Sequence, residues 1–230
     1  MLLKMEAVGD EGLALQPRMM ATRLRRKMVE RQRFIGEFFR SPATVGAIAP
    51  SSAGLAAAML EPIDFTRARA IAEFGAGTGS LTKHILERRL EHTKFVAFEP
   101  NPTFFAGLTG RWGPSFFTRR GAEEFRATLK DRRIQHCDAV VSGLPWANLK
   151  REVQMSILRQ VLTCLAPEGV FVTFAYVQGL ILPGGARFRS LLRQHFPSVE
   201  CTRVVWTNLP PAFVYVCRKH AENSGRAAVR

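Results

Sequence analysis

From residue 69 onward, short apolar runs alternate with longer segments whose apolar residues recur at helical spacing. The strand-like runs are 69–74, 94–98, 115–119, 137–142, 169–177, 199–206 and 212–217, and the helix-like runs are 80–90, 102–111, 150–165 and 186–195. This alternation implies right-handed crossovers and a mostly parallel sheet covered by helices on both faces. Residues 207–211 leave no room for a helix, so the last two strands should pair antiparallel. The pattern predicts an α/β fold with a seven-stranded sheet that ends in a β-hairpin.

The length of 230 residues and the hydrophobic content of 47% suit one domain with an extension. We expect a flexible leader at 1–17, N-terminal helices within 18–60, the main domain at 61–218 and a basic tail at 219–230. The first of these helices, 18–40, carries eight Lys and Arg residues against two acids beside an imperfect apolar arc. This pattern predicts a basic amphipathic helix. A second helix at 51–60 has Ser51 or Ser52 as its N-cap.

The cysteines and histidines give no sign of a disulfide framework or a metal site. The four cysteines form no C-x-x-C pair and lie in apolar segments, so we expect small buried thiols in a reducing compartment. The five histidines lack ligand spacing, so no metal is expected. Residues 1–17 lack the apolar core of a secretory signal, and the longest apolar run, 170–183, is too short to span a bilayer. We therefore expect a cytoplasmic protein without a transmembrane segment.

A glycine-rich turn follows the first apolar run of this domain. Glu73-Phe74-Gly75-Ala76-Gly77-Thr78-Gly79 predicts the end of a strand, a turn and a helix that begins at Ser80. Alternate glycines let the backbone approach a ligand where a Cβ would clash. A dinucleotide-binding turn has the spacing G-x-G-x-x-G, whereas here Ser80 stands in place of the third glycine. Glu73 would repel a pyrophosphate but attract the amino group and sulfonium of S-adenosylmethionine. The turn therefore predicts a methyl-donor site, and the alternative is a structural turn without a ligand.

Acidic residues after two later strands fit the remainder of such a donor. Glu99 ends the strand-like run 94–98, where it can accept hydrogen bonds from both ribose hydroxyls. The alternative is an acid that is simply solvated at the end of a strand. Glu123 or Glu124 follows the third strand, where an acid can accept from the adenine amino group. An acid there could equally stabilise the dipole of the following helix.

The segment Ser142-Gly143-Leu144-Pro145-Trp146 ends the fourth strand. Many methyltransferases that act on nitrogen have a polar–apolar–Pro–aromatic turn here, which presents carbonyls and a ring to the amine. We expect this turn to position the acceptor, with no dedicated base assigned. The alternative is a strand exit stopped by a proline, with Trp146 at the rim. Methylated amines are attracted to aromatic faces, which makes Trp146, Tyr176 and Phe39 candidates, although each could also be simple packing.

The chain resembles the bacterial phospholipid N-methyltransferases, which methylate phosphatidylethanolamine toward phosphatidylcholine. The matching stretches are 38–52, 73–79, 141–145 and 208–215, within a resemblance that covers about residues 34–218. The glycine motif is shared by many methyltransferases, whereas Ser-Pro-x-Thr-Val-Gly-Ala-x-Ala-Pro-Ser-Ser at 41–52 and Asn-Leu-Pro-Pro-Ala at 208–212 are more specific. The resemblance implies a Rossmann-like class I methyltransferase that converts S-adenosylmethionine to S-adenosylhomocysteine and takes a phospholipid headgroup as acceptor.

These arguments define two sets of expected site residues. The expected donor-binding residues are Ser51, Ser52, Glu73, Gly75, Ala76, Gly77, Thr78, Gly79, Glu99, Pro100, Ala122, Glu123 and Ser142. The expected acceptor-positioning residues are Ser142, Gly143, Leu144, Pro145, Trp146 and Tyr176.

The net charge of +14 calls for an anionic partner. On the lipid interpretation, the basic segment 18–40 holds the enzyme on the inner face of the membrane, at about 1 kcal/mol per Lys or Arg. That segment could instead be a solvated helix packed on the domain. An RNA methyltransferase, such as a ribosomal RNA adenine dimethyltransferase, would explain the charge equally well. Those enzymes have Asn or Asp where this chain has Ser142, so nucleic acid is the weaker hypothesis. An ornithine lipid is the alternative lipid acceptor, and a non-enzymatic tether is the least supported interpretation. The sequence gives no oligomeric state.

Overall fold

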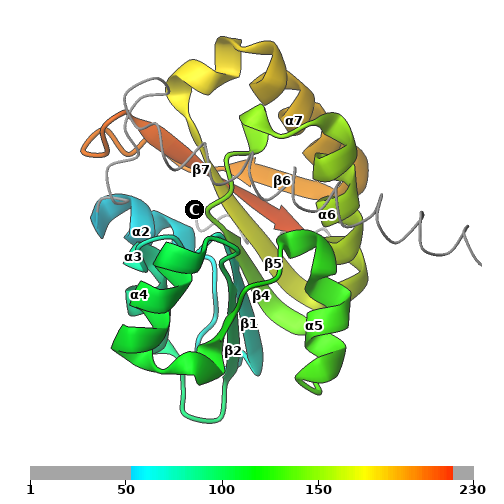
Figure 1. Cartoon of the computed structure of the whole chain (residues 1–230). Coiled ribbons are helices and arrows are strands. Elements are labelled where there is room, and N and C mark those ends of the chain that lie inside the picture. The colour runs from blue at the N-terminus through cyan, green and yellow to red at the C-terminus, as the bar shows by residue number, and fades with distance from the viewer. Residues whose placement is uncertain (1–52, 220–230) are drawn as a thin grey trace, which may run out of the picture. The chain divides into compact units, whose positions relative to one another are not determined.

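The structure, a computed structural model, describes residues 53–219, which form a seven-stranded sheet in the order β3-β2-β1-β4-β5-β7-β6 (Figure 1). The strands are β1 (Ala70–Phe74), β2 (Lys94–Phe98), β3 (Phe117–Thr118), β4 (Cys137–Ser142), β5 (Leu165–Tyr176), β6 (Ser198–Cys201) and β7 (Ala212–Arg218). The pairs among β1 to β5 are parallel, and β7 runs antiparallel to both of its neighbours, β5 and β6. The predicted α/β fold, with a mostly parallel sheet and an antiparallel pairing of the last two strands, is confirmed.

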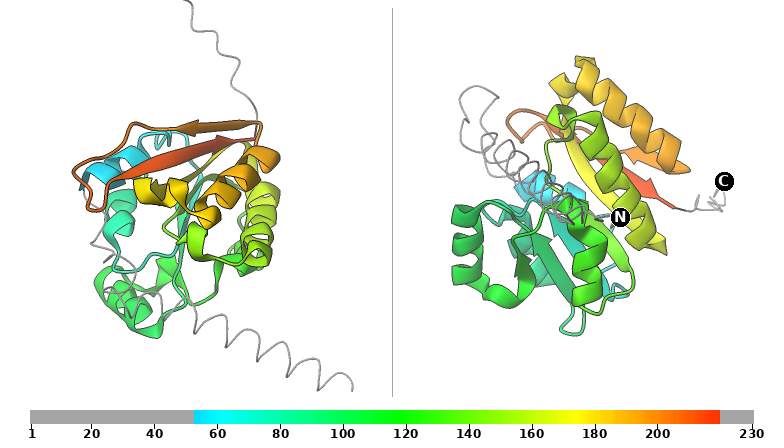
Figure 2. Two further views of the ribbon diagram at one scale, coloured as in Figure 1. Left: turned by 90° about the horizontal axis from the view of Figure 1, so that it is seen from above. Right: turned by 45° about the vertical axis from the view of Figure 1, so that its right-hand side comes forward.

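Helices cover both faces of this sheet (Figures 1 and 2). They are α2 (Ala53–Leu60), α3 (Ser80–Arg88), α4 (Pro102–Trp112), α5 (Phe125–Asp131), α6 (Arg151–Cys164) and α7 (Pro183–His195). One hydrophobic cluster joins a face of the sheet to α2, α3 and α4, and a second joins the other face to α5, α6 and α7. In the second cluster the Phe74 ring packs edge-on against Phe98 and Phe125, at 5.3 and 4.9 Å between centroids. This packing fixes the carboxyl ends of β1 and β2, which carry the donor turn and Glu99.

Several elements differ from the sequence-based expectation, among them β5, which begins at Leu165 and not at 169. α5 was not predicted, because a helix of seven residues gives too short a window for a helical period to be recognised. β3 contains only Phe117 and Thr118, since Pro114–Phe116 form a 3-10 turn. β6 ends at Cys201 instead of continuing to residue 206. There the Thr202 hydroxyl, and not a backbone carbonyl, accepts a hydrogen bond from Val214 N at 3.0 Å, so the regular ladder stops.

The chain reverses its order of strand addition between β1 and β4. Parallel open sheets bind ligands at such a switch point, outside the carboxyl ends of the strands. The segments that leave β1 and β4, namely 75–79 and 143–146, both lie at this edge. Among residues 53–219, no helix has the length and apolar content needed to cross a bilayer. The leader 1–17, the basic segment 18–40 and all of the predicted tail except Lys219 fall outside the described residues.

Candidate active site

The donor turn adopts a backbone conformation that requires its glycines. Gly75, Gly77 and Gly79 have φ values of 74°, 55° and 86°, in the left-handed region that residues with a Cβ rarely adopt. A Cβ on Gly79 would lie 2.5 Å from the Trp112 ring. Among the described residues, a Cβ on Gly77 would meet only the Gly75 carbonyl, 4.0 Å away. The turn is thus tightly packed at Gly79 and leaves room for a ligand at Gly77.

Backbone hydrogen bonds attach this turn to the strands on either side. Gly75 N donates to Phe98 O at 2.9 Å, at the end of β2, and Gly143 N donates to Phe74 O at 2.8 Å. A Cβ on Gly143 would lie 3.0 Å from Gly75 O, so the donor turn and the exit from β4 are in direct contact. The predicted donor and acceptor segments are therefore neighbours in space.

Glu73 is the buried acid at the start of this turn, with 1% of its surface exposed. Its Oε2 accepts a hydrogen bond from Thr82 Oγ1 at 2.6 Å, whereas its Oε1 is buried and has no hydrogen-bond partner among the described residues. Burial raises the pKa of Glu73 to about 7; the Thr82 hydroxyl opposes this rise and the nearby charge of Glu99 adds to it. A ligand ammonium at Oε1 would supply the missing donor and neutralise the charge.

Sequence reasoning did not identify Thr82 as a site residue. Thr82 is fully buried on α3, between the inward-facing Leu81 and Ile85. A threonine at a core position, in the first turn of the helix that follows the glycine turn, is the signal that could have pointed to it. Its hydroxyl holds the Glu73 carboxylate so that Oε1 is the oxygen left for a ligand.

Glu99 connects the end of β2 to the middle of the donor turn. It is fully buried, with Oε2 accepting from Gly77 N at 2.7 Å and Oε1 accepting from Asn101 N at 2.9 Å. Burial raises the pKa of Glu99, and these backbone hydrogen bonds oppose the rise. Because each carboxylate oxygen can accept about two hydrogen bonds, one lone pair on each remains for a ribose hydroxyl. Glu99 is therefore not a solvated strand-end acid, and its contact with ribose stays a prediction.

The residues expected near the adenine ring lie in a 3-10 turn, Ala122–Glu124, immediately before α5. Ala122 is buried and Glu123 is half-buried. The Glu123 carboxylate folds back over Gly121, where an added Cβ would lie 2.5 Å from its Oε2. Glu124 Oε2 lies 3.7 Å from Arg120 Nε. Neither acid makes a side-chain capping hydrogen bond to this turn or to α5, and the contact with adenine stays a prediction.

Other members of the predicted donor set surround the turn without strong contacts of their own. Ala76 is buried and its N–H donates to Phe98 O at 3.3 Å. Thr78 is exposed, with its hydroxyl 3.3 Å from that of Ser80, and Pro100 is half-buried. Ser51, Ser52 and the aromatic candidate Phe39 lie outside the described residues.

The acceptor turn after β4 is more deeply packed than the sequence suggested. Ser142 is fully buried, and its hydroxyl accepts from Trp146 Nε1 at 3.0 Å. Trp146 is 2% exposed and stacks on Phe188 at 4.6 Å between centroids and 13° between planes. The expectation that Trp146 lies at the rim or presents its ring to the amine is therefore wrong. The packing interpretation holds, because Phe188 on α7 and the core around Phe171 enclose the indole.

The carbonyl groups of this turn differ in their hydrogen bonding. Ser142 O accepts from Thr173 Oγ1 at 3.0 Å, Leu144 O from Trp146 N at 2.9 Å and Pro145 O from Asn148 N at 2.9 Å. Within the described residues no hydrogen bond to Gly143 O is found. Among these carbonyls, Gly143 O is therefore the one with both lone pairs left for an acceptor amine. Leu144 is buried beside Gly75. A Cβ added to Gly75 would lie 3.1 Å from Leu144 Cδ2.

Tyr176 is the remaining aromatic candidate in the described residues. It is half-buried at the carboxyl end of β5, where it pairs with Ala212 of β7. Its ring packs edge-on against Phe174, with 5.5 Å between centroids. Burial raises the pKa of Tyr176, so the phenol stays neutral at physiological pH. An accessible ring at this edge can face a substrate cation, unlike that of Trp146.

Comparison with known proteins places this geometry in a family. The chain is 31% identical over 188 residues to the ornithine lipid N-methyltransferase of Singulisphaera acidiphila, an alignment that covers 80% of this chain and 94% of that relative. The chain belongs to the family of this lipid N-methyltransferase. It is accordingly a class I methyltransferase that uses S-adenosylmethionine, as its fold and donor turn predicted. No protein-family model matches the chain.

Several solved structures share this fold. An O-methyltransferase from Bacillus cereus in complex with S-adenosylhomocysteine has a TM-score of 0.58 at 14% identity, covering 81% of this chain and 90% of that chain. The 1,6-didemethyltoxoflavin N1-methyltransferase of Burkholderia thailandensis has a TM-score of 0.57 at 15% identity, covering 95% and 94%. A TehB-like methyltransferase from Corynebacterium glutamicum has a TM-score of 0.54 at 13% identity, covering 83% and 99%. At these identities the likeness concerns the fold alone.

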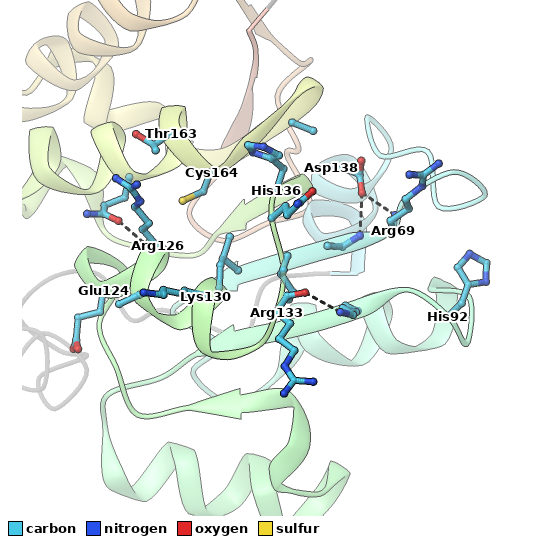
Figure 3. Close-up of a pocket in the computed structure, with 18 of the residues that line it drawn as sticks. Arg69, His92, Glu124, Arg126, Lys130, Arg133, His136, Asp138, Thr163 and Cys164 are labelled. Atoms are coloured by element: carbon cyan, nitrogen blue, oxygen red, sulfur yellow. Dashed lines mark hydrogen bonds between the residues drawn. The ribbon is translucent and has the colours of Figure 1, made fainter.

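A hollow of about 1750 Å³, with several charged side chains in its lining, lies at the opposite edge of the sheet from the donor turn (Figure 3). Arg69, Lys94 and Asp138, at the amino ends of β1, β2 and β4, contribute to its lining. Asp138 Oδ2 there accepts from Arg69 N at 2.7 Å, and Lys94 Nζ donates to Arg133 O at 2.9 Å. Because Gly77, Glu73 and Glu99 are absent from its lining, this hollow is distinct from the methyltransferase site. Within residues 53–219, no cluster of side chains suited to hold a metal is found.

The burial of Trp146 makes a testable prediction for this methyltransferase. Trp146→Phe should keep the stacking on Phe188 but remove the hydrogen bond to Ser142, so the free energy of unfolding should fall by about 1–2 kcal/mol. Urea denaturation measures this loss. The ratio of methylated products should not change, because the ring does not face the amine. A shifted product ratio in a fully folded variant would restore the acceptor role of Trp146.

Proposed function

We propose that this enzyme transfers methyl groups from S-adenosylmethionine to the headgroup amine of a membrane lipid, with ornithine lipid as its first acceptor. The unpaired, buried Oε1 of Glu73 carries the donor part of the proposal. The acceptor part is supported by the ornithine lipid N-methyltransferase relative. Phosphatidylethanolamine, which the resemblance to phospholipid N-methyltransferases implies, is the second candidate, since its headgroup also ends in a primary amine.

The described residues fit the donor at three points. Glu73 Oε1 can accept a hydrogen bond from the donor's α-ammonium group, and the space at Gly77 admits the donor to the backbone. Glu99 has lone pairs left for the ribose hydroxyls. Glu73 and Glu99 are both buried carboxylates, and their negative charges repel each other. A cationic ligand relieves this repulsion, whereas an anionic ligand would add to it. When bound, S-adenosylmethionine supplies the reactive methyl group on its sulfonium.

Methyl transfer to an amine is an in-line displacement, in which the N–C bond forms as the C–S bond breaks. An alkylammonium has a pKa near 10, so the lipid amine must lose a proton to solvent before its nitrogen can attack. Gly143 O can accept a hydrogen bond from the amine and aim its lone pair toward the donor turn, which Gly143 contacts. The dense packing of Leu144 and Trp146 behind this carbonyl keeps it fixed.

The raised pKa of Glu73 predicts how donor affinity depends on pH. Burial raises the Glu73 pKa to about 7 in the ligand-free protein, and the cationic donor binds the ionised form. The apparent Kd for S-adenosylmethionine should therefore rise about tenfold from pH 8 to pH 6. Isothermal titration calorimetry across this range measures it. A Kd that stays constant between these pH values would contradict the assignment of Glu73 to the donor ammonium.

Tyr176 should affect the later methylation steps more than the first. Once the amine carries methyl groups and remains cationic, an aromatic face attracts it by up to about 2 kcal/mol when desolvated. Tyr176→Ala should therefore reduce the yield of the most methylated product by about tenfold, while Tyr176→Phe, which retains the ring, should preserve it. Mass spectrometry of the products distinguishes these steps. Equal losses in both variants would indicate a role of the hydroxyl instead.

A panel of acceptors tests the proposed function. The full chain is incubated with methyl-labelled S-adenosylmethionine and with vesicles that contain ornithine lipid, phosphatidylethanolamine or phosphatidylcholine, or with ribosomal RNA. Phosphatidylcholine is the matched control, because its nitrogen is already fully methylated. We expect label in ornithine lipid, and in phosphatidylethanolamine if the site accepts both headgroups. Label that enters only RNA would overturn the lipid assignment in favour of the nucleic-acid hypothesis. Attachment through the basic segment 18–40 and a location at the inner membrane face remain predictions.

A further inference from the structure

We propose that two loops beside the active site insert apolar side chains into an anionic lipid bilayer and turn the donor edge of the sheet toward it. The loops are η4 (Val177–Ile181) with the adjoining Leu182, and the β6–β7 connection, 202–211. We call them together the insertion loops. The functional role of the insertion loops rests on the proposed lipid substrate. Their insertion into a bilayer can be tested without measuring methyl transfer.

Exposed large apolar side chains of the described residues gather on the insertion loops. Ile181 is 86% exposed and Leu182 51%, and across the β6–β7 connection Trp206 is 73% and Leu209 78% exposed. Leu180 adds a further half-exposed side chain at 39%. Contiguous exposed apolar groups mark an interaction surface, because leaving them in water is unfavourable. Leu90, at 40%, lies near the amino edge, away from these loops.

Both insertion loops lie at the edge that carries the donor turn. η4 continues from the carboxyl end of β5, and β7, which is antiparallel, begins at this same edge with Ala212 opposite Tyr176. Val177 N donates to Pro211 O at 2.9 Å and joins the bases of the two loops. Figure 1 shows the yellow η4 segment and the orange β6–β7 connection on the same side of the molecule, at the upper left.

The start of α7, which directly follows the first insertion loop, packs against the segment that continues from the acceptor turn. A Cβ on Gly184, two residues after Leu182, would overlap the carbonyl oxygen of Ala147. Ala147 belongs to η3 (Trp146–Asn148), which continues from the acceptor turn Ser142–Trp146. Trp146 in turn stacks on Phe188 of α7. A bilayer that holds Ile181 and Leu182 would therefore present its headgroups close to Gly143.

Hydrogen bonds hold the second insertion loop in one conformation, in which its apolar side chains are exposed to solvent. Val205 N donates to Ala212 O at 2.7 Å and closes the loop at its base. Asn208, which is 5% exposed, donates from Nδ2 to Pro210 O at 2.7 Å and braces its interior. Trp206 and Leu209 project from either side of this brace. Tryptophan is enriched at the membrane–water interface, where an amphipathic ring is most stable.

The charge around the insertion loops complements an anionic membrane. Between residues 177 and 211 the one acid is Glu200, whereas the basic side chains of Arg and Lys are Arg187, Arg189, Arg193 and Arg203. Leu180 shares a hollow of about 390 Å³ with Arg189 and Arg193. The Arg189 Nε is buried and has no hydrogen-bond partner among the described residues. A guanidinium in this position suits the phosphate or carboxylate of a lipid headgroup.

Quenching of Trp206 fluorescence tests this surface in the full chain. The protein is mixed with vesicles of phosphatidylglycerol whose acyl chains carry bromine, and Trp206→Phe isolates the signal of Trp206 from those of Trp112 and Trp146. We expect a blue shift and quenching that disappear in Trp206→Phe. Ile181→Ser and Leu209→Ser should each weaken vesicle partitioning by about tenfold. The matched control Leu90→Ser removes an exposed leucine near the opposite edge and should partition as the wild type does.

Several outcomes would overturn the insertion surface. These are quenching that survives in Trp206→Phe, an equal loss in Leu90→Ser, or a Trp206 shift on RNA but not on vesicles. A dispersed short-chain amino lipid separates this proposal from the proposed function. If the wild type methylates that lipid but shows no Trp206 quenching on vesicles, the insertion surface is wrong and the function stands. If Trp206 is quenched but no amino lipid is methylated, the function is wrong and the surface stands.

Discussion

Replacing Glu73 by glutamine should strongly weaken donor binding and at the same time make the ligand-free protein more stable at pH 8. Glutamine keeps the shape of the side chain and can still accept the hydroxyl of Thr82, but it carries no charge for the donor's ammonium. We expect the affinity for S-adenosylmethionine to fall by about 100-fold or more, the value of a hydrogen bond between charged groups at a buried site.

The gain in stability follows from the direction of the pKa shift. Burial raises the Glu73 pKa from 4.5 to about 7, so folding favours the protonated carboxyl. The stability that this preference contributes is complete below the unfolded pKa and is lost as the pH rises through the folded pKa. At pH 8 the wild type therefore holds a buried, ionised carboxylate that Glu73→Gln removes, and the variant should be more stable by about 1–3 kcal/mol.

Calorimetric titration with the donor and urea unfolding of Glu73→Gln test both effects. Unfolding at pH 4, where the wild-type carboxyl is protonated, should bring the two proteins close together in stability. Glu87→Gln serves as the matched control, since Glu87 is an exposed acid on α3, paired with Lys83 at 3.8 Å, whose loss should change little. Donor binding by Glu73→Gln at wild-type affinity would refute the role of Glu73.

Alanine at two glycines of the donor turn should separate folding from binding. Gly79→Ala combines a left-handed φ of 86° with a Cβ 2.5 Å from the Trp112 ring. Backbone strain and overpacking together should lower the free energy of unfolding by about 3 kcal/mol. Gly77→Ala has a left-handed φ of 55° but no close neighbour among the described residues, so it should cost about 1–2 kcal/mol.

The order of the two variants should be reversed for donor binding: Gly77→Ala should lose more affinity than Gly79→Ala. The methyl group of Gly77→Ala occupies the space through which the donor reaches the backbone, so donor affinity should fall by about 30-fold or more in a folded protein. Any Gly79→Ala protein that remains folded should lose less affinity, because its Cβ faces Trp112 and not the ligand. Thermal unfolding and calorimetric titration of both proteins measure the contrast. Equal stability of the two variants would mean that Gly79 is not packed as described.

The fold was largely predictable because its signal is periodic. Apolar runs separated by helical segments determine a parallel sheet through the right-handed crossover, and the absence of a helix between 207 and 211 determines the antiparallel end. α5 escaped prediction because seven residues carry little periodicity. The end of β6 escaped it because a single hydroxyl, that of Thr202, replaces the ladder hydrogen bond.

The site could be predicted at positions where the backbone conformation requires a particular residue. It could not be predicted at positions whose role depends on packing against distant residues. The three glycines of the turn, with Glu73 and Glu99, follow from a local conformation and from strand ends that must adjoin. Whether Trp146 faces the amine or the core depends on Phe188, which lies 42 positions away in the sequence. Thr82 and Gly143 O acquire their roles only from the hydrogen bonds that neighbouring groups make or leave unmade.

The position of the transferred methyl group tests the central claim most directly. The full chain is incubated with deuteromethyl S-adenosylmethionine and ornithine lipid in vesicles, and the purified lipid is fragmented in a mass spectrometer. We expect the labelled methyl group on the headgroup nitrogen, and much less of it when Gly77→Ala replaces the wild type at a donor concentration below the weakened Kd. A label on an oxygen of the lipid, or an unlabelled lipid with an enzyme that binds the donor, would contradict an N-methyltransferase of lipid headgroups.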